Sequence, residues 1–367
     1  MRLDKNLEVR LIEFGKALIN QEKARLIINP YGNSSGFWFG GGNIVKDKKT
    51  GKIFICGRYR NPGDSRFGIS KGERGLELAI FKTDNKFEKL EKIKSWSKKE
   101  LEYNGMEVLS IEGSAILLTD KKVEIFVSSE KKIPYPEGFK NYQKEGTGIW
   151  SIDVFYGRDI ENIEPVNIRN ILSSKEPEFL HLKDPVVFNK NGDTYMIFCQ
   201  HPFCWSTSFS GLAVRRKGKK KFEIIARDIL PRGYTWDVAV TRITERVPVP
   251  KIGKFKNLPD ISLYFYDGAE CIKEHPSSKK VKIPKGYSCE EIGGLAYGFD
   301  DEFPTIYKLS KYFPLFYSPE GTGCSRYVSV LYDEGEMVAI WQKSSSDFSQ
   351  PLVMNKLTEK EIREILE

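Results

Sequence analysis

The sequence predicts an all-β protein, built as a single five-bladed β-propeller domain over residues 1–367 with a short C-terminal helix. Three observations support this prediction. The chain is rich in aromatic residues, which make up 13% of it. Short runs of β-branched and aromatic residues recur along its length, separated by polar turns. These runs group into five units of about four strands each, and four-stranded units repeated around an axis are the blades of a propeller.

Each expected blade is built around a strand, a polar turn and a second strand. These cores lie, in chain order, at 36–60, 109–130, 183–202, 234–271 and 289–342. They place the blades at about 29–100, 101–170, 176–231, 232–285 and 286–350. The third core contains the turn "NKNGD", whose Asn-Gly pair favours a hairpin. Helical periodicity is strong only at the ends of the chain, notably in 357–367, where Thr358 has the chemistry of a helix cap.

Charge and hydropathy exclude several classes of partner. The chain has 58 Lys and Arg against 50 Asp and Glu, a formal charge of +8, and much of the excess lies in turns such as 217–222 and 277–285. No basic helix, zinc-finger spacing or RNA-binding signature accompanies it, so we expect no nucleic-acid partner. We see no signal-peptide pattern and no membrane-spanning run, and we therefore expect a cytoplasmic protein without a membrane partner. The sequence carries no signal for an oligomeric state.

The six cysteines are scattered, and several lie inside strand patterns, as expected of reduced, buried thiols. Cys199, His201 and Cys204 lie close together in the sequence, but their spacing matches no zinc pattern. We therefore expect no metal at this point of the chain.

Acidic residues stand near the start of the expected innermost strand in four of the five blades. They are Glu112, Asp184, Asp237 and Glu291, while the first blade has Gly41, Gly42 and Asn43 at the corresponding place. Because innermost strands line a common axis, we expect the four carboxylates to converge. Clustered like charges are costly, and their convergence indicates a functional site.

Two carboxyl groups on either side of a bound sugar are the machinery of glycoside cleavage. We therefore predict a glycoside hydrolase acting on a small oligosaccharide or glycoside. Glu112 is the expected proton donor, Asp237 or Glu291 the second carboxylate, and Asp184 the residue that orients sugar hydroxyls. No cofactor is expected, although converging acids would tolerate a cation such as calcium.

Further residues are expected to bind the sugar. Arg58 and Arg74 flank a Gly/Pro-rich loop at 57–75 and have the donor geometry for a substrate clamp. Trp236 and Trp205, with the aromatic run at 37–39, are expected beside the channel mouth, where they would present flat apolar faces.

At these residues the chain resembles the five-bladed β-propeller glycosidases, the clan of arabinanases, β-xylosidases and invertases. It is most similar in pattern to the mannoside phosphorylase/hydrolase family. The similar segments are Arg58 with "SRFGIS" at 65–70, "KDPVVFNKNGDTYMIFCQHP" at 183–202, and the closing blade at 314–336. The resemblance implies that Glu112 holds the place of a second-blade proton donor. It gives Asp184 the place of a third-blade acid that holds sugar hydroxyls, with Lys183 and His201 as oxyanion contacts.

The chain also departs from these families. The Glu-Asp-Pro-Arg motif of the mannoside family reads Ile-Glu-Gly-Ser here, at 111–114. The first blade supplies a base aspartate in the arabinanase type, and here that place holds Asn43, which we expect to contact substrate instead. Two alternatives therefore stay open. The protein could be a phosphorylase that uses inorganic phosphate in place of water, or a propeller that binds glycans or a protein without catalysis.

Overall fold

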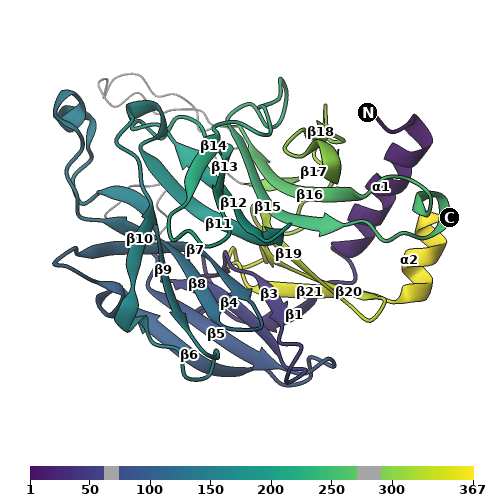
Figure 1. The fold of residues 1–367 in the computed structure, drawn as a ribbon, viewed down its shortest axis with the longest axis horizontal. Coiled ribbons are helices and arrows are strands. Elements are labelled where there is room, and N and C mark those ends of the chain that lie inside the picture. Colours follow the sequence, from purple (N-terminus) through teal and green to yellow (C-terminus); the bar gives the residue numbers. More distant parts are fainter. Residues whose placement is uncertain (62–73, 271–290) are drawn as a thin grey trace.

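A computed structural model describes residues 1–61, 74–270 and 291–367. The segment at 65–70 and the lysine-rich turn at 277–285 lie outside the described residues. Five β-sheets are arranged around a common axis, so the predicted all-β, five-bladed β-propeller is confirmed (Figure 1). Each sheet is one blade.

The first three blades follow the chain in order, and within each the strands run from the axis outward. Blade one consists of β2 (Trp38–Gly40), β3 (Ile44–Lys46), β4 (Ile53–Arg60), β5 (Glu77–Thr83) and β6 (Glu91–Ser97). Blade two consists of β7 (Val108–Leu118), β8 (Val123–Lys131), β9 (Ile149–Gly157) and β10 (Arg169–Leu172). Blade three consists of β11 (His181–Lys190), β12 (Asp193–His201), β13 (Phe209–Arg215) and β14 (Glu223–Ala226).

Blade four ends later in the chain than the sequence pattern indicated. It consists of β15 (Val240–Pro248), β16 (Ile261–Ala269), β17 (Ile292–Phe299) and β18 (Tyr307–Lys308). The sequence analysis gave residues 292–299 to the fifth blade, but β17 is hydrogen-bonded to β16 along its whole length. The long segment between these two strands hid their pairing, because hairpins are usually recognised by short connections.

Blade five is completed by the start of the chain. It consists of β19 (Ser325–Asp333), β20 (Glu336–Lys343), β21 (Leu352–Leu357) and, outermost, β1 (Arg25–Ile28). β1 pairs antiparallel with β21, for example Arg25 with Met354. The ring is therefore closed by backbone hydrogen bonds between an N-terminal strand and a C-terminal strand, a pairing that the expected blade boundaries did not include.

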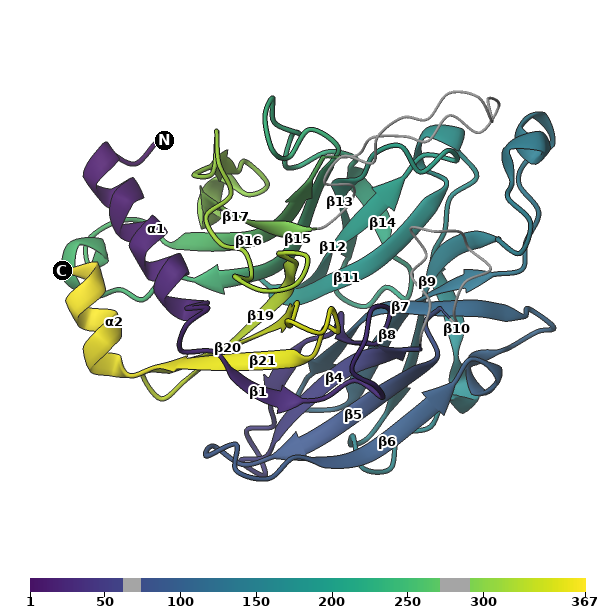
Figure 2. The same ribbon diagram turned by 180° about the vertical axis from the view of Figure 1, so that it is seen from behind.

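Two helices lie side by side at the outer edge of blades four and five (Figures 1 and 2). They are α1 (Lys5–Leu18) and α2 (Glu359–Leu366). Leu11, Phe14 and Leu18 of α1 share one apolar core with Ile362 and Leu366 of α2. The expected C-terminal helix is confirmed, and Thr358 caps it in a reciprocal capping box with Glu361.

Short turns of 3-10 helix connect several of the strands. Turns of 3-10 helix occur at Lys99–Leu101, Glu137–Tyr142, Pro165–Asn167, Pro177–Phe179, Gly253–Phe255 and Asp300–Glu302. Among the described residues, no helix combines the length and apolarity needed to cross a bilayer.

The innermost strands of blades two to five are each irregular near their start. The pairing register shifts at 111–114 in β7, 183–186 in β11, 243–245 in β15 and 326–329 in β19. Such β-bulges redirect side chains and are frequent beside functional sites. Asp184 and Tyr327, with φ of 55° and 53°, adopt left-handed backbone that non-glycine residues seldom use. The fold is therefore least regular where the four inner strands meet.

Candidate active site at the propeller axis

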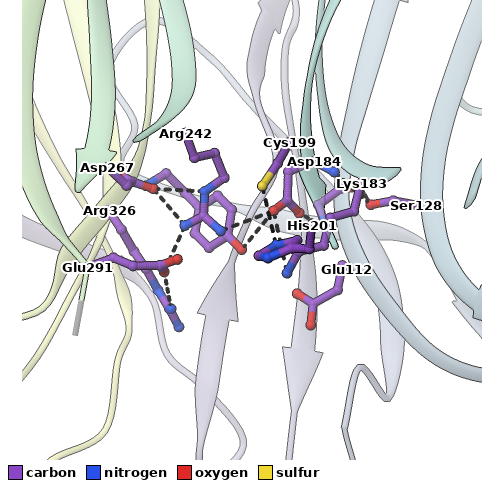
Figure 3. Close-up of polar contacts among 12 residues, drawn as sticks. Glu112, Ser128, Lys183, Asp184, Cys199, His201, Arg242, Asp267, Glu291 and Arg326 are labelled. Carbon is purple, nitrogen blue, oxygen red and sulfur yellow. Dashed lines mark hydrogen bonds and ion pairs between the residues drawn. The ribbon is translucent and has the colours of Figure 1, made fainter. Parts of the chain in front are cut away.

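Charged side chains from blades two to five meet at the bulged ends of the inner strands (Figure 3), and Arg58 of blade one joins them through its contact with Glu112. We call this group the axial cluster. Its carboxylates are Glu112, Asp184, Asp267 and Glu291, and its cations are Arg58, Lys183, Arg242 and Arg326. The structure therefore brings together three of the four predicted acids and adds a fourth that the sequence analysis did not select.

Arg242 of β15 is the centre of the cluster. Its Nη2 lies 2.7 Å from Oδ2 of Asp267 and 2.7 Å from Oε2 of Glu291, and its Nη1 donates to Oδ2 of Asp184 at 3.1 Å. The side chain is almost fully buried and stacks over the Tyr327 ring, 4.1 Å from its centroid. One guanidinium thus links three carboxylates (Figure 3).

Glu112 of β7 is bound by one arginine. Nε and Nη2 of Arg58 each lie 2.8 Å from Oε2 of Glu112, and Nη1 of Arg58 donates to the carbonyl of Gly40 at 3.2 Å. Burial raises the pKa of Glu112, but Arg58 and Lys183 outweigh it and lower the pKa to about 2. Glu112 is therefore ionised at neutral pH in the unliganded protein.

Glu291, just before β17, is bound by two arginines. Arg326 and Arg242 both contact its Oε2. Burial again raises the pKa, and the two guanidiniums overcome this effect and lower it to about 2. The side chain of Glu291 is 13% exposed and that of Glu112 19%.

Asp184 of β11 is more deeply placed, with 5% of its side chain exposed. Its Oδ1 accepts the backbone N–H of Gly113 at 2.9 Å, and its own backbone N–H donates to Ser128 Oγ at 3.1 Å. A side chain at position 113 would collide with it, because a Cβ there would lie 2.4 Å from the same Oδ1. Asp184 therefore joins blades two, three and four.

Lys183 and His201 lie next to Asp184 (Figure 3). Nζ of Lys183 is 3.8 Å from Oδ2 of Asp184 and lies over the rings of Trp150 and Trp205. Burial lowers the pKa of Lys183, but Asp184 and Glu112 outweigh it, so the pKa is raised and the ammonium stays charged.

His201 is a neutral imidazole. Nδ1 donates to the carbonyl of Thr207 at 3.0 Å, which leaves Nε2 as the acceptor, 3.4 Å from Sγ of Cys199. Burial and the charge of Lys183 hold the pKa of His201 well below its usual range. The ring also packs against Trp205, so His201 borders the cluster as an uncharged group.

Two predicted residues of blade four lie outside the cluster, which corrects the expectation for them. Asp237 is fully buried and accepts hydrogen bonds from Tyr266 Oη at 3.0 Å and from Lys308 Nζ. Trp236 stacks on the same Tyr266 ring and donates from Nε1 to the carbonyl of Ser310 at 3.1 Å. The physical reason is that β15 begins at residue 240, so both residues lie in the preceding loop and pack into the blade.

The predicted residues of blade one differ in whether they reach the axial cluster. Asn43 links blade one to blade two through both of its amide atoms, accepting from the N–H of Ile116 at 2.8 Å and donating to its carbonyl at 2.9 Å. Arg74 forms an ion pair with Glu130 at 2.7 Å and donates to the carbonyl of Gly146. Of the predicted residues of blade one, Arg58 reaches the axial cluster.

Sequence reasoning missed Arg242, Asp267, Arg326 and Tyr327. A usable signal existed for Asp267 and Arg242, because each is a charged residue inside a run of strand-forming residues, "LYFYDGA" and "VTRIT". Charged residues in buried strands are rarely tolerated unless they are paired. Pairing these two opposite charges would have placed them together in blade four.

Among the described residues, no group of three His, Cys, Asp or Glu side chains lies close enough to hold a metal ion. The acids of the axial cluster are neutralised by guanidinium and ammonium groups instead. A cavity of about 20 Å³, bordered by Gly113, Asp184 and Tyr327, is the size of about one water molecule. This donor set does not suit calcium, which takes six to eight oxygen ligands.

No protein-family model matches the sequence, and no curated protein sequence matches it. Solved structures do match. One is described as a glycoside hydrolase, with a TM-score of 0.62 and 10% identity over 97% of this chain and 96% of that one. The chain shares its five-bladed β-propeller fold with this glycoside hydrolase. The α-L-arabinofuranosidase from Lactobacillus brevis gives a TM-score of 0.56 at 12% identity, over 92% of this chain and 94% of that one.

The β-1,2-mannobiose phosphorylase from Listeria innocua is similar to the same extent. Its TM-score is 0.55 at 12% identity, over 93% of this chain and 96% of that one. At such identities the likeness concerns the fold. The structural resemblance to propeller glycosidases and to a mannoside phosphorylase, expected from the sequence, is confirmed at that level.

Proposed function

We propose that the protein is a glycoside-active enzyme, a hydrolase of a small oligosaccharide or glycoside that uses Glu112 and Glu291 as catalytic carboxylates. One observation carries the choice of these residues. Their side chains are 19% and 13% exposed, whereas those of Asp184 and Asp267 are 5% and 0% exposed. A sugar at the axis could therefore reach the first pair and not the second.

The pKa of both carboxylates is lowered to about 2, but they differ in the number of guanidinium groups that contact them. Glu291 has two guanidinium partners, which suits a base or a nucleophile. Glu112 has one such contact, with Arg58. If a substrate hydroxyl draws Arg58 away, the pKa of Glu112 rises and the carboxyl becomes able to donate a proton. We assign Glu112 as proton donor on this ground.

The other predicted contacts have positioning or binding roles in this proposal. Lys183 and Arg58 carry donors that suit sugar hydroxyls. Trp205 packs against His181, with ring centroids 4.0 Å apart, and against His201, at 4.7 Å, and it supplies an aromatic surface beside Lys183. Asp184, which is sealed by Gly113 and Arg242, orients Lys183 rather than the sugar.

Substitution tests the two roles separately. Glu112→Gln and Glu291→Gln should each lower turnover by on the order of 10²–10⁴, measured as sugar release from a panel of arabino-, xylo- and manno-oligosaccharides. On aryl glycosides with a dinitrophenolate leaving group, which needs no proton, Glu112→Gln should recover activity and Glu291→Gln should not.

The matched control is Glu124→Gln. Glu124 is a fully buried glutamate of blade two, bound by both terminal nitrogens of Arg215 outside the axial cluster. Its loss should affect stability and leave turnover per folded molecule unchanged. Wild-type turnover in Glu112→Gln or Glu291→Gln would remove that residue from the mechanism.

A phosphorylase is the second candidate, and the cations favour it. Arg60, which also lowers the pKa of Glu112, adds a fifth cation to the four of the axial cluster, and burial together with nearby arginines lowers its own pKa to about 10. Such a site suits inorganic phosphate. Assays with and without phosphate decide between the two, because a strict phosphate requirement and release of a sugar 1-phosphate would reject the hydrolase. A protein that binds these sugars and turns over none of them would be a glycan-binding propeller.

A further inference from the structure

Asp267 is a charged residue that no ligand can reach. It lies on β16, the second strand of blade four, and its side chain has no exposed surface. Oδ2 accepts from Nε and Nη2 of Arg242 at 3.2 and 2.7 Å and from the backbone N–H of Tyr327 at 3.3 Å. Oδ1 is buried and has no hydrogen-bond partner in the described part of the chain.

Arg242 connects Asp267 to Glu291, which is partly exposed. The guanidinium that Asp267 holds is the same one that contacts Glu291 and Asp184. Figure 3 shows it lying between these three carboxylates. A change in the bond between Arg242 and Asp267 should therefore change where the guanidinium lies and how strongly it binds Glu291.

We propose that Asp267 is a positioning residue: it holds Arg242 where that group contacts both Glu291 and Asp184, and its charge state sets how strongly Arg242 binds them. This inference rests on the proposed function only where it concerns turnover. Asp267 itself would touch neither sugar nor phosphate.

The surroundings of Asp267 make its charge state variable. The charged and titratable groups that face it are Arg242 from β15, Glu291 ahead of β17, and Tyr327 from β19. Burial raises the pKa of Asp267, Arg242 opposes this and Glu291 adds to it, with a result of about 7. Asp267 therefore carries a proton in mildly acidic solution and loses it as the pH passes through neutrality.

The coupling has a definite sign. An ionised Asp267 competes with Glu291 for Arg242, so it raises the pKa of Glu291 relative to the state in which Asp267 is protonated. Asp267→Asn keeps the shape of the side chain and fixes the neutral state at every pH. The variant should therefore lack any change in the site that wild type shows near neutral pH.

The kinetic test compares pH profiles of kcat and kcat/KM between pH 5 and 9. Wild type should show an inflection near neutral pH that Asp267→Asn lacks, with kcat altered more than KM. Asp153→Asn is the matched control, since Asp153 is a buried aspartate of blade two that pairs with Lys131. Profiles of wild type and Asp267→Asn that coincide would overturn the proposal.

Two further measurements need no turnover. Asp267 keeps its proton to about pH 7 when folded, whereas an unfolded aspartate loses it near pH ~4. Its contribution to stability is therefore fully present below about pH 4 and is lost progressively as the pH rises to about 7. In urea unfolding, Asp267→Asn should gain stability relative to wild type between pH 5 and pH 8, and a constant difference would contradict the titration of Asp267.

A crystal structure of Asp267→Ala tests the positioning role directly. Arg242 should leave Glu291 or Asp184 when its anchor is removed, and an unmoved guanidinium would overturn the proposal. If wild type cleaves no glycoside with or without phosphate, the proposed function fails, while the urea and crystal measurements still decide the role of Asp267.

Discussion

Arg58 is the main group that keeps Glu112 ionised in the unliganded protein. It supplies both close contacts to the Glu112 carboxylate, and its own side chain is fixed by the Gly40 carbonyl. Burial acts on Glu112 in the opposite direction. The proposed mechanism therefore depends on one ion pair that a substrate must open.

Arg58→Met removes the charge and keeps most of the length of the side chain. The pKa of Glu112 should rise from about 2, because burial is then opposed mainly by Lys183. The limb of the pH–kcat/KM profile that Glu112 governs should move to higher pH. Arg215→Met, which breaks the distant pair with Glu124, is the control and should leave that limb in place. An unmoved limb in Arg58→Met would mean that Arg58 does not control Glu112.

Individual site residues could be predicted only where their position in a strand determines the direction in which the side chain points. Glu112, Asp184 and Glu291 follow from their places near the starts of strands. Asp237 looked equivalent, but β15 begins three residues later, at Val240, and the side chain turns into the blade. Arg242 and Asp267 lie directly opposite each other in the pairing of β15 with β16, and they escaped because the sequence pattern does not reveal this register across the residues that separate the two strands.

At the level of elements, the bulged inner strands are what build the site. Gly113 lies within the bulge of β7 and donates its N–H to Asp184 of the neighbouring blade. A Cβ at this position would lie 2.4 Å from Oδ1 and 2.9 Å from Cα of Asp184. Two bulges therefore contact each other at a point where a methyl group has no room.

Gly113→Ala should displace Asp184 and loosen the contact between blades two and three. We expect lower turnover and a free energy of unfolding reduced by about 1–3 kcal/mol, as is typical of overpacking, measured by urea unfolding. Gly138→Ala is the control, since a Cβ there would meet nothing within 4 Å. Equal stability of the two variants would show that the bulges can separate without cost.

Most strands could be predicted from runs of strand-forming residues and from the polar turns between them. Their assignment to blades could not be predicted in every case. β17 was placed in the wrong blade because its partner β16 is separated from it by residues 270–291. The pairing of β1 with β21 joins residues more than 300 positions apart, for example Arg25 and Met354. Such distant pairing leaves no local pattern in the sequence.

At the level of the whole molecule, the ring is held closed at blade five. β1 completes that sheet, and α1 and α2 pack together against blades four and five. Phe14 is fully buried in this shared core, whereas Val9 of the same helix is 44% exposed. The helices therefore stabilise the part of the ring where the two ends of the chain meet.

Phe14→Ala should lower the free energy of unfolding by about 3–5 kcal/mol, as expected for an aromatic ring removed from a core. Urea unfolding followed by circular dichroism measures this. Val9→Ala should change stability by less than about 0.5 kcal/mol. If Phe14→Ala unfolded at the same urea midpoint as wild type, α1 would not support the closure of the ring.

The position of the two termini has a consequence for how the chain can be rearranged. Both lie at the same edge of the molecule, where the Met1 amino group bonds Glu302 and the Leu366 carbonyl lies beside Gly253 (Figure 1). A short linker from residue 367 to residue 1 would make the backbone a circle. Opening that circle between blades two and three, near residue 174, would give a circularly permuted protein. Its new ends would lie between these two blades, and the residues of the axial cluster should keep their arrangement.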